Sequence, residues 1–205
     1  MLGGNKIILE GRLLEKILRC VTEEKPALYS SFQKALEKVF QWEGVKTDDA
    51  SDSGGLTMFG VSLAFLRQGK IDLNNDGIVD RKDVMMVDKE EAERIYKAFF
   101  WDKLQCDKIS NFLIQRQLFD IGVNMGNSTS VKLLQRCLNS LGENLKVDGL
   151  IGSKTLSVIK TKDCTILNNL MVEERIKKYN SIVEKYPKNS KFLRGWVNRA
   201  KSYYV

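Results

Sequence analysis

Apolar side chains recur every three or four residues along most of this chain, and this spacing constrains the fold more than any other feature. Between Ser30 and Glu43 the repeating positions are Phe32, Leu36 and Val39, a stripe that predicts an amphipathic helix packed on a core. The same spacing predicts further helices over residues 5–23, 88–101, 110–125, 128–141, 163–186 and 190–203. Strand-like alternation is scarce, so we expect a mainly α protein.

The length of 205 residues suits one globular domain or a two-lobed one. Pro26 follows the first helix, so we predict an N-terminal helical extension over residues 1–26 and one domain over 27–205, with lobes at 27–109 and 110–205. Glu10 and Arg12 interrupt any hydrophobic core of a signal peptide. No stretch reaches the length of a membrane span.

Histidine is absent, which removes Ser-His and Cys-His nucleophiles and the usual histidine-bearing zinc sites. Carboxylates are then the main acid–base groups, beside lysine, tyrosine and cysteine. The four cysteines, Cys20, Cys106, Cys137 and Cys164, lack metal-ligand spacing. Cys137 lies among leucines, so we expect a buried free thiol there. The pattern does not indicate disulfides and fits synthesis in a reducing cytoplasm.

The net charge of +7 is concentrated in the last part of the chain. From Lys160 onward there are eleven Lys and Arg against four Asp and Glu, so residues 1–159 balance to zero. A basic surface suits an anionic polymer such as bacterial wall, nucleic acid or a lipid surface, although a merely solvated helical surface looks the same. The interleaved glycines and aromatics of common single-strand modules are lacking, so nucleic acid is not the expected partner.

A stretch rich in acidic and turn residues follows the helix that ends near Glu43. Glu43 lies four residues beyond Val39, so it continues the apolar face, and we expect partial desolvation that suits a general acid. The turn-rich loop contains Asp52, Gly54, Gly55 and Thr57. Paired glycines allow the backbone to approach a bound chain closely.

The pattern E-G followed by D-x-G-G-x-T-x-x-G resembles the signature of phage-type N-acetylmuramidases of glycoside hydrolase family 108. The order of Glu43, Asp52 and Thr57 is also similar to the catalytic triad of phage lysozymes. One departure is Val45, where the family usually has a second glycine. The resemblance implies a lysozyme-like helical fold with a small loop or β region around the active site, those three residues as catalytic groups, and Gly54 and Gly55 as substrate-binding positions.

The segment IDLNNDGIVDRKD predicts a metal site inserted after the central loop. Oxygen ligands at positions 1, 3, 5, 7, 9 and 12, with glycine at position 6, are the spacing of an EF-hand loop. An aspartate at position 12 resembles the calcium loop of dockerin modules more than a sensor EF-hand. We expect a structural Ca²⁺ over residues 72–83, held by Asp72, Asn74, Asp76, the carbonyl of Ile78, Asp80 and Asp83.

Two later helices carry further candidate residues. Aromatics at helical spacing are usually core, but Tyr96 and Trp101 are also candidates to line a sugar groove, and E-A-x-x-I-Y-x-x-F-F-W resembles a family pattern. Asp120 and Asn124 lie four residues apart in F-D-I-G-V-N-M-G, which is similar to a phage muramidase motif. We expect this pair to bind substrate or support the cleft.

The segment V-D-G-x-I-G-x-x-T, residues 147–155, resembles a short motif of predicted peptidoglycan-binding segments. Ordinary turn chemistry explains its residues equally well, with Ser153 as a helix cap. The resemblance as a whole implies a lysozyme that cleaves the β-1,4 bond between N-acetylmuramic acid and N-acetylglucosamine, with Glu43 as general acid and, by analogy with phage lysozymes, inversion at the anomeric carbon.

Two other interpretations remain open. The first is a lytic transglycosylase, which would use Glu43 alone. The second is a non-catalytic wall-binding or phage structural protein, and Val45 is the one feature of the sequence in its favour. We expect a monomer that acts on peptidoglycan in the periplasm or cell wall after synthesis in the cytoplasm. A phage or prophage endolysin is the simplest source, and an exported antibacterial effector would look the same in sequence.

Overall fold

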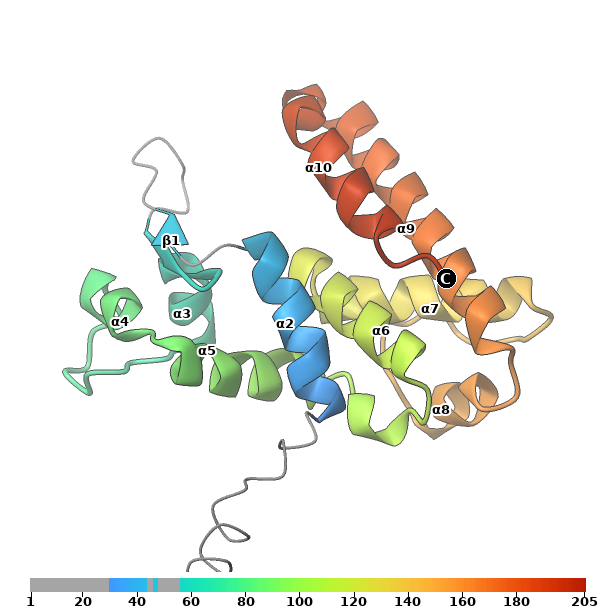
Figure 1. Ribbon diagram of the computed structural model, residues 1–205, viewed down its shortest axis with the longest axis horizontal. Helices are drawn as coiled ribbons and strands as arrows, with labels where there is room; N and C mark the ends of the chain where they lie inside the picture. The colour runs from blue at the N-terminus through green and yellow to red at the C-terminus, as the bar shows by residue number, and fades with distance from the viewer. Residues whose placement is uncertain (1–29, 44–45, 48–55) are drawn as a thin grey trace, which may run out of the picture. The chain divides into compact units, whose positions relative to one another are not determined.

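The computed structural model describes residues 30–43, 46–47 and 56–205 (Figure 1). The expected boundary at residue 26 lies outside these ranges and stays a prediction. In chain order the elements are α2 (Ser31–Glu43), β1 (Lys46–Thr47), β2 (Thr57–Met58), β3 (Val61–Ser62), α3 (Leu63–Gly69), α4 (Arg81–Met86), α5 (Lys89–Tyr96), η1 (Lys97–Trp101), η2 (Cys106–Lys108), α6 (Phe112–Met125), α7 (Asn127–Ser140), α8 (Ser153–Ile159), α9 (Cys164–Lys185), η3 (Pro187–Asn189) and α10 (Ser190–Lys201). The mainly α fold expected from the sequence is confirmed.

The sheet in the described residues is small and antiparallel, in the order β1-β2-β3. Met58 pairs with Val61, so only Phe59 and Gly60 form the connection between β2 and β3. Both have positive φ, 50° and 79°, which is the geometry of a two-residue type I′ hairpin and explains the glycine. Ser62 then caps α3 by accepting a hydrogen bond from the backbone N–H of Phe65.

The helix expected over residues 88–101 changes type partway. It is α-helical as α5, and η1 continues it as a π-helix, with the N–H of Asp102 bonded to the carbonyl of Lys97. Residues five apart share a face in a π-helix but not in an α-helix. Trp101 is therefore on the buried side together with Tyr96, and both side chains are in the core.

Trp101 was a candidate for sugar binding, and that prediction is wrong. Its side chain is fully buried and packs edge-to-face against Phe32 and Phe119, with both pairs of ring centroids 5.5 Å apart. Its indole N–H donates to Asp107 at 2.8 Å. A ring enclosed in this way cannot contact a bound sugar.

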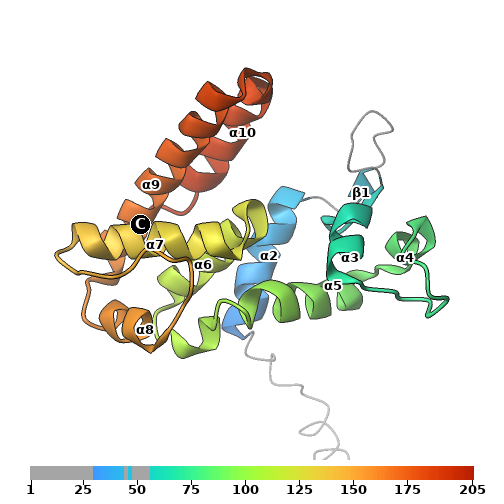
Figure 2. The ribbon, with the colours of Figure 1, turned by 180° about the vertical axis from the view of Figure 1, so that it is seen from behind.

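The central helix is α6, which contacts α2, α7 and α9 (Figure 2). Apolar residues cover most of its circumference, as the sequence predicts for a buried helix, and Asp120 is fully buried within it. After α7, the segment 147–155 forms a turn that packs back on the start of that helix. A Cβ on Gly149 would lie 2.4 Å from the Ser128 hydroxyl oxygen.

Ser153 does not cap α8 as the sequence suggested. The N-cap is Gly152, without a side-chain cap, and Ser153 is the first helical residue. The turn before it is instead stabilised by Asp148, whose carboxylate accepts hydrogen bonds from the Gln135 amide and from the backbone N–H of Leu150. Local turn chemistry accounts for these contacts.

The last two helices, α9 and α10, form an antiparallel hairpin (Figure 1). Pro187 begins the short η3 between them, as expected from the fixed φ of proline. Their contact is a second small core of Val172, Tyr179, Ala200 and Tyr203.

Cys106, Cys137 and Cys164 are free thiols, and burial raises the pKa of Cys137 to about 12, which agrees with the predicted buried thiol. In the part of the chain that is described, no helix is both long and apolar enough to span a membrane.

Candidate active site

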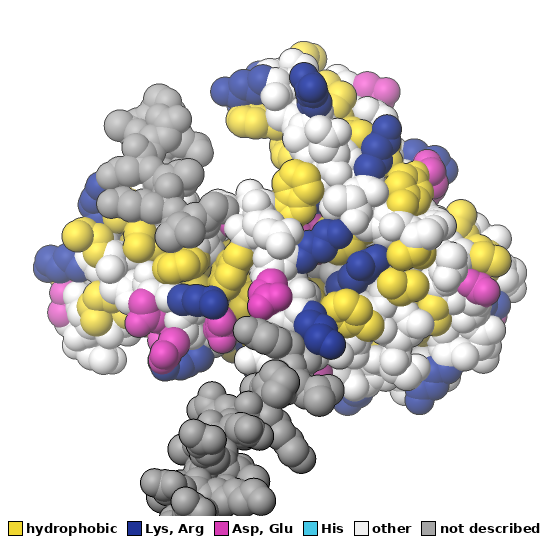
Figure 3. Space-filling view, in the orientation of Figure 1, with side chains coloured by type: hydrophobic (Ala, Val, Ile, Leu, Met, Phe, Trp, Pro, Cys, Tyr) yellow, Lys and Arg dark blue, Asp and Glu magenta, His cyan; other side chains and the backbone are white. Residues whose placement is uncertain are grey.

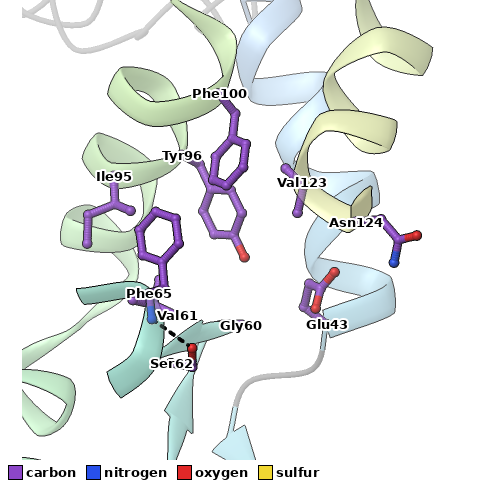
Figure 4. Close-up of a pocket in the computed structure, with 10 residues that line it drawn as sticks. All are labelled: Glu43, Gly60, Val61, Ser62, Phe65, Ile95, Tyr96, Phe100, Val123 and Asn124. Atoms are coloured by element: carbon purple, nitrogen blue, oxygen red, sulfur yellow. Dashed lines mark hydrogen bonds between the residues drawn. The ribbon is translucent and has the colours of Figure 1, made fainter. Parts of the chain in front are cut away.

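Glu43 is the last residue of α2, and its side chain lies at the edge of a pocket of about 270 Å³. The Glu43 side chain is 25% exposed, so it is partly desolvated, as the sequence predicted, and still reachable. Figure 4 shows this carboxyl and the Tyr96 hydroxyl on opposite sides of one hollow. The lining residues are Glu43, Gly60, Val61, Ser62, Phe65, Ile95, Tyr96, Phe100, Val123 and Asn124.

The turn between β2 and β3 packs directly against the candidate acid. A Cβ on Gly60 would lie 2.5 Å from the Tyr96 hydroxyl oxygen and 3.0 Å from the Glu43 side chain. The Tyr96 hydroxyl donates to the carbonyl of Phe59 at 3.0 Å. Burial, followed by the charge of Glu43, raises the pKa of Tyr96. Tyr96 therefore borders the pocket as a neutral hydroxyl.

Arg199, from α10, holds the Glu43 carboxylate. Its Nη1 lies 2.6 Å from Glu43 Oε1, and its Nε and Nη2 donate to the buried Asp120, with Nη2 2.8 Å from Oδ1. Arg175, from α9, adds a second ion pair to Asp120 at 2.6 Å. Two carboxylates thus share one guanidinium.

The charges in this network stabilise one another against the cost of burial. Burial alone would raise the pKa of Asp120, but the charges of Arg175 and Arg199 outweigh it and hold the pKa below its usual value. Burial also acts to lower the pKa of Arg199, and Asp120 and Glu43 raise it instead. Asp120 and Arg199 are consequently both ionised.

Asn124 extends the network toward solvent. Its Oδ1 accepts a hydrogen bond from the Tyr179 hydroxyl at 2.5 Å, and that hydroxyl accepts one from Arg175 Nε at 2.8 Å. Asn124 also lines the pocket beside Glu43. The expected placement of Asp120 and Asn124 on one face of α6 is therefore correct, but only Asn124 can reach a ligand. Asp120 supports the cleft from inside, and its assignment as a substrate-binding residue is wrong.

Several predicted site residues lie outside the described ranges. These are Asp52, Gly54 and Gly55, together with Val45, so their roles stay predictions. Thr57 is in β2, paired with Thr47 and Ser62. For Tyr96 the sequence left two alternatives, a core residue or a residue that lines a sugar groove. The residue lines the pocket, although most of its ring is buried in the core.

Arg175 and Arg199 were not among the site residues predicted from the sequence. A signal was present, because each lies within four residues of apolar positions that repeat at helical spacing, Arg175 between Val172 and Tyr179 and Arg199 after Trp196. An arginine at such a position needs a buried anion. Asp120, in the apolar helix α6, is the buried anion that such arginines need.

The segment 72–83 is a loop that runs into the first turn of α4, and its carboxylates are largely occupied by its own backbone. Asp83 accepts hydrogen bonds from the N–H groups of Leu73, Asn74 and Asp80, and the bond from Asp80 contributes most to lowering its pKa. Asp72 Oδ2 accepts from Gly77 at 2.7 Å, whereas Asp72 Oδ1 is buried without a hydrogen-bond partner. No group of three Cys, Asp or Glu side chains within the described residues is arranged to hold a metal ion.

Two segments of the chain match models of known protein families. Residues 36–126 match the family model described as Glycosyl hydrolase 108, and residues 129–201 match the one described as Predicted Peptidoglycan domain. A solved structure of SagA from Brucella abortus is similar, with a TM-score of 0.69 and 25% sequence identity over 84% of this chain and 91% of that chain. No curated protein matches the sequence.

The fold is thus mainly α and lysozyme-like. The family matches support a glycoside hydrolase that acts on peptidoglycan. Both matched segments contribute to the site, because Glu43 and Asp120 come from the first and Arg175 and Arg199 from the second. The second segment is therefore part of the site's construction.

Proposed function

We propose that this protein is an N-acetylmuramidase, which cleaves the β-1,4 bond between N-acetylmuramic acid and N-acetylglucosamine. The observation that carries the proposal is the position of Glu43. Its carboxyl is accessible in a pocket, fixed by Arg199, and lies in the segment that matches the Glycosyl hydrolase 108 model. A positioned, partly desolvated carboxyl is the group that general acid catalysis of glycoside cleavage requires.

In this mechanism Glu43 donates a proton to the glycosidic oxygen as the bond to the anomeric carbon breaks. To do so it must carry the proton while Arg199 stays charged beside it. Arg199 keeps Asp120 as a partner through its Nε and Nη2 groups, so protonation of Glu43 does not leave a buried cation without an anion. The shared guanidinium therefore positions the acid.

We assign Asp52, assisted by Thr57, to orienting the water that attacks the anomeric carbon and to accepting the proton that this water loses. Inversion requires two carboxyl groups about 6.5–9.5 Å apart, with room for that water. Support for this assignment is the sequence resemblance and the place of Thr57 in β2, the strand that leads into the turn against Glu43. Gly54 and Gly55 would let the loop approach the glycan.

The products of digestion test the bond and the reaction together. Purified peptidoglycan is digested in water enriched in ¹⁸O, and the released fragments are identified by mass spectrometry. We expect new reducing N-acetylmuramic acid ends that carry one ¹⁸O atom. New reducing N-acetylglucosamine ends would refute the bond assignment. Proton NMR of the first-formed anomer tests inversion.

A lytic transglycosylase is the second candidate. Among the described residues that line the pocket beside Tyr96 and the two hollows next to it, Glu43 is the sole carboxylate. Transglycosylase chemistry can use one carboxyl as acid and then as base. It adds no water, so its products carry anhydro-muramic ends and no ¹⁸O. The same digestion therefore separates the two reactions.

We also propose that residues 72–83 bind a structural Ca²⁺, with Asp72, Asn74, Asp76, the Ile78 carbonyl, Asp80 and Asp83 as the donors. Hard oxygen ligands suit this ion. Asp72 Oδ1 has no hydrogen-bond partner, so this oxygen can coordinate the ion. Binding would require the carboxylates to converge from their present arrangement, and Asp83 would have to exchange its backbone hydrogen bonds for the ion. Calorimetric titration with CaCl₂ should show binding that is lost in Asp72→Ala. The absence of heat and of any change in melting temperature would refute the site.

A further inference from the structure

A second hollow of about 390 Å³ adjoins the pocket beside Tyr96. It shares Glu43 and Asn124 with that pocket, so the two hollows meet at the candidate acid. Figure 3 shows the surface hollowed beside the α9–α10 hairpin, which carries hydrophobic and basic side chains. The residues that line the second hollow but not the first are Trp42, Lys191, Phe192, Gly195, Trp196 and Arg199.

Two of these residues expose large aromatic rings. Trp42, next to Glu43 on α2, is 40% exposed, and Phe192, in the first turn of α10, is 47% exposed. Single exposed apolar residues are common, but aromatic rings gathered on a concave surface are typical of ligand sites. Their position beside Glu43 relates them to the same ligand.

The aromatic rings are also fixed in place. Phe192 and Trp196 are four residues apart on α10, with centroids 5.8 Å apart and planes at 27°. Trp196 stacks in turn on Tyr179 at 5.3 Å and 25°. The Tyr179 hydroxyl is bonded to Asn124 and Arg175. The network that holds Glu43 therefore also holds this stack, which lowers the entropy cost of binding.

We propose that Trp42 and Phe192, with Trp196 supporting the Phe192 ring from below, form a sugar-binding surface for the part of the glycan strand that continues past Glu43 toward α10. The C–H face of a pyranose is apolar and packs on the electron-rich face of an aromatic ring. Lys191 lies over the Phe192 ring, with Nζ 4.8 Å from its centroid, where it suits the lactyl carboxylate of a muramic acid that carries no peptide. This inference rests on the proposed function and identifies the surface on which the glycan strand binds beyond Glu43.

Intrinsic fluorescence gives a direct test because the chain has three tryptophans. Trp101 is fully buried, so a glycan can alter the emission mainly through Trp42 and Trp196. The probe is a peptide-free hexasaccharide of alternating N-acetylglucosamine and N-acetylmuramic acid, added to full-length Glu43→Gln so that it stays intact. We expect a saturable change in emission, and about tenfold weaker binding when Phe192→Ala is added.

The matched control is Tyr186→Ala, because Tyr186 is an aromatic residue of the same hairpin, 48% exposed, that lines neither hollow. Its affinity should equal that of the parent. Calorimetric binding that is unchanged by Phe192→Ala and by Trp42→Ala, in proteins with unchanged melting temperature, overturns the proposed surface. Binding through these residues by a wild type that cuts no glycan supports the surface and refutes only the hydrolase assignment.

Discussion

Replacing Asp120 by asparagine tests the charge network behind the site. The substitution is nearly isosteric, so it removes the negative charge and little volume. Arg175 and Arg199 are then left without the fully buried anion that both contact. Arg199 retains Glu43, which is partly exposed, and Arg175 retains its hydrogen bond to the Tyr179 hydroxyl.

The expected loss of stability follows from this arrangement. Removing one partner of a buried ion pair typically costs about 3–5 kcal/mol, because an uncompensated charge remains. For a chain of 150–250 residues, each kcal/mol shifts the melting temperature by about 2–4 °C. We therefore expect Asp120→Asn to melt about 6–20 °C below the wild type.

The effect should depend on pH in one direction. The folded protein lowers the pKa of Asp120, so its ion pairs stabilise the fold fully above the ordinary aspartate pKa of about 3.9. That contribution is lost as the pH falls through the lower folded-state value. The stability difference between wild type and Asp120→Asn should thus be constant near neutral pH and shrink below about pH 4.

Urea denaturation followed by circular dichroism measures both quantities. Asp102→Asn is the control, because Asp102 pairs with Lys97 with both side chains about half exposed, and such a pair is worth at most about 1 kcal/mol. A loss for Asp120→Asn no larger than that of the control would refute the assignment of Asp120 as the anion that supports the site.

Three further substitutions test the site and the core. Gly60→Ala places a Cβ at positive φ, against Tyr96 and Glu43. It should lower the free energy of unfolding by about 1–3 kcal/mol, measured by thermal melting, and lower kcat, measured by lysis of cell walls. Arg199→Lys keeps the charge but not the fork that joins two carboxylates, and should reduce kcat at least about tenfold, measured as reducing-end release; unchanged kcat would contradict its positioning role. Trp101→Ala should cost about 3–5 kcal/mol and leave KM unchanged, since Trp101 contacts no groove; a raised KM in folded protein would restore it as a sugar contact.

Local periodicity predicted the helices well because it records which face of a helix is buried. The stripe of Phe32, Leu36 and Val39 places α2 on the core, and the position of Glu43 at its end follows from the same spacing. The break at Pro187 is likewise a local effect of proline geometry.

The partners of the site could not be predicted in this way. The bond from Arg199 to Glu43 joins residues 156 positions apart, and no local pattern encodes which arginine meets which carboxylate. Trp101 was misassigned because the expected α-helix becomes a π-helix after Tyr96, which rotates the ring into the core. Aromatic spacing alone does not distinguish a groove from a core when the helix type changes.

The most direct test of the account is whether Glu43, and not another acid on the same helix, is required to cut the glycan. Release of reducing ends from purified peptidoglycan is compared for wild type, Glu43→Gln and Glu37→Gln, with folding verified by circular dichroism. Glu37 is an exposed acid on α2, so its variant controls for a change of charge. We predict wild-type activity for Glu37→Gln and a loss of at least about a hundredfold for folded Glu43→Gln. Activity of Glu43→Gln equal to that of Glu37→Gln would contradict the account.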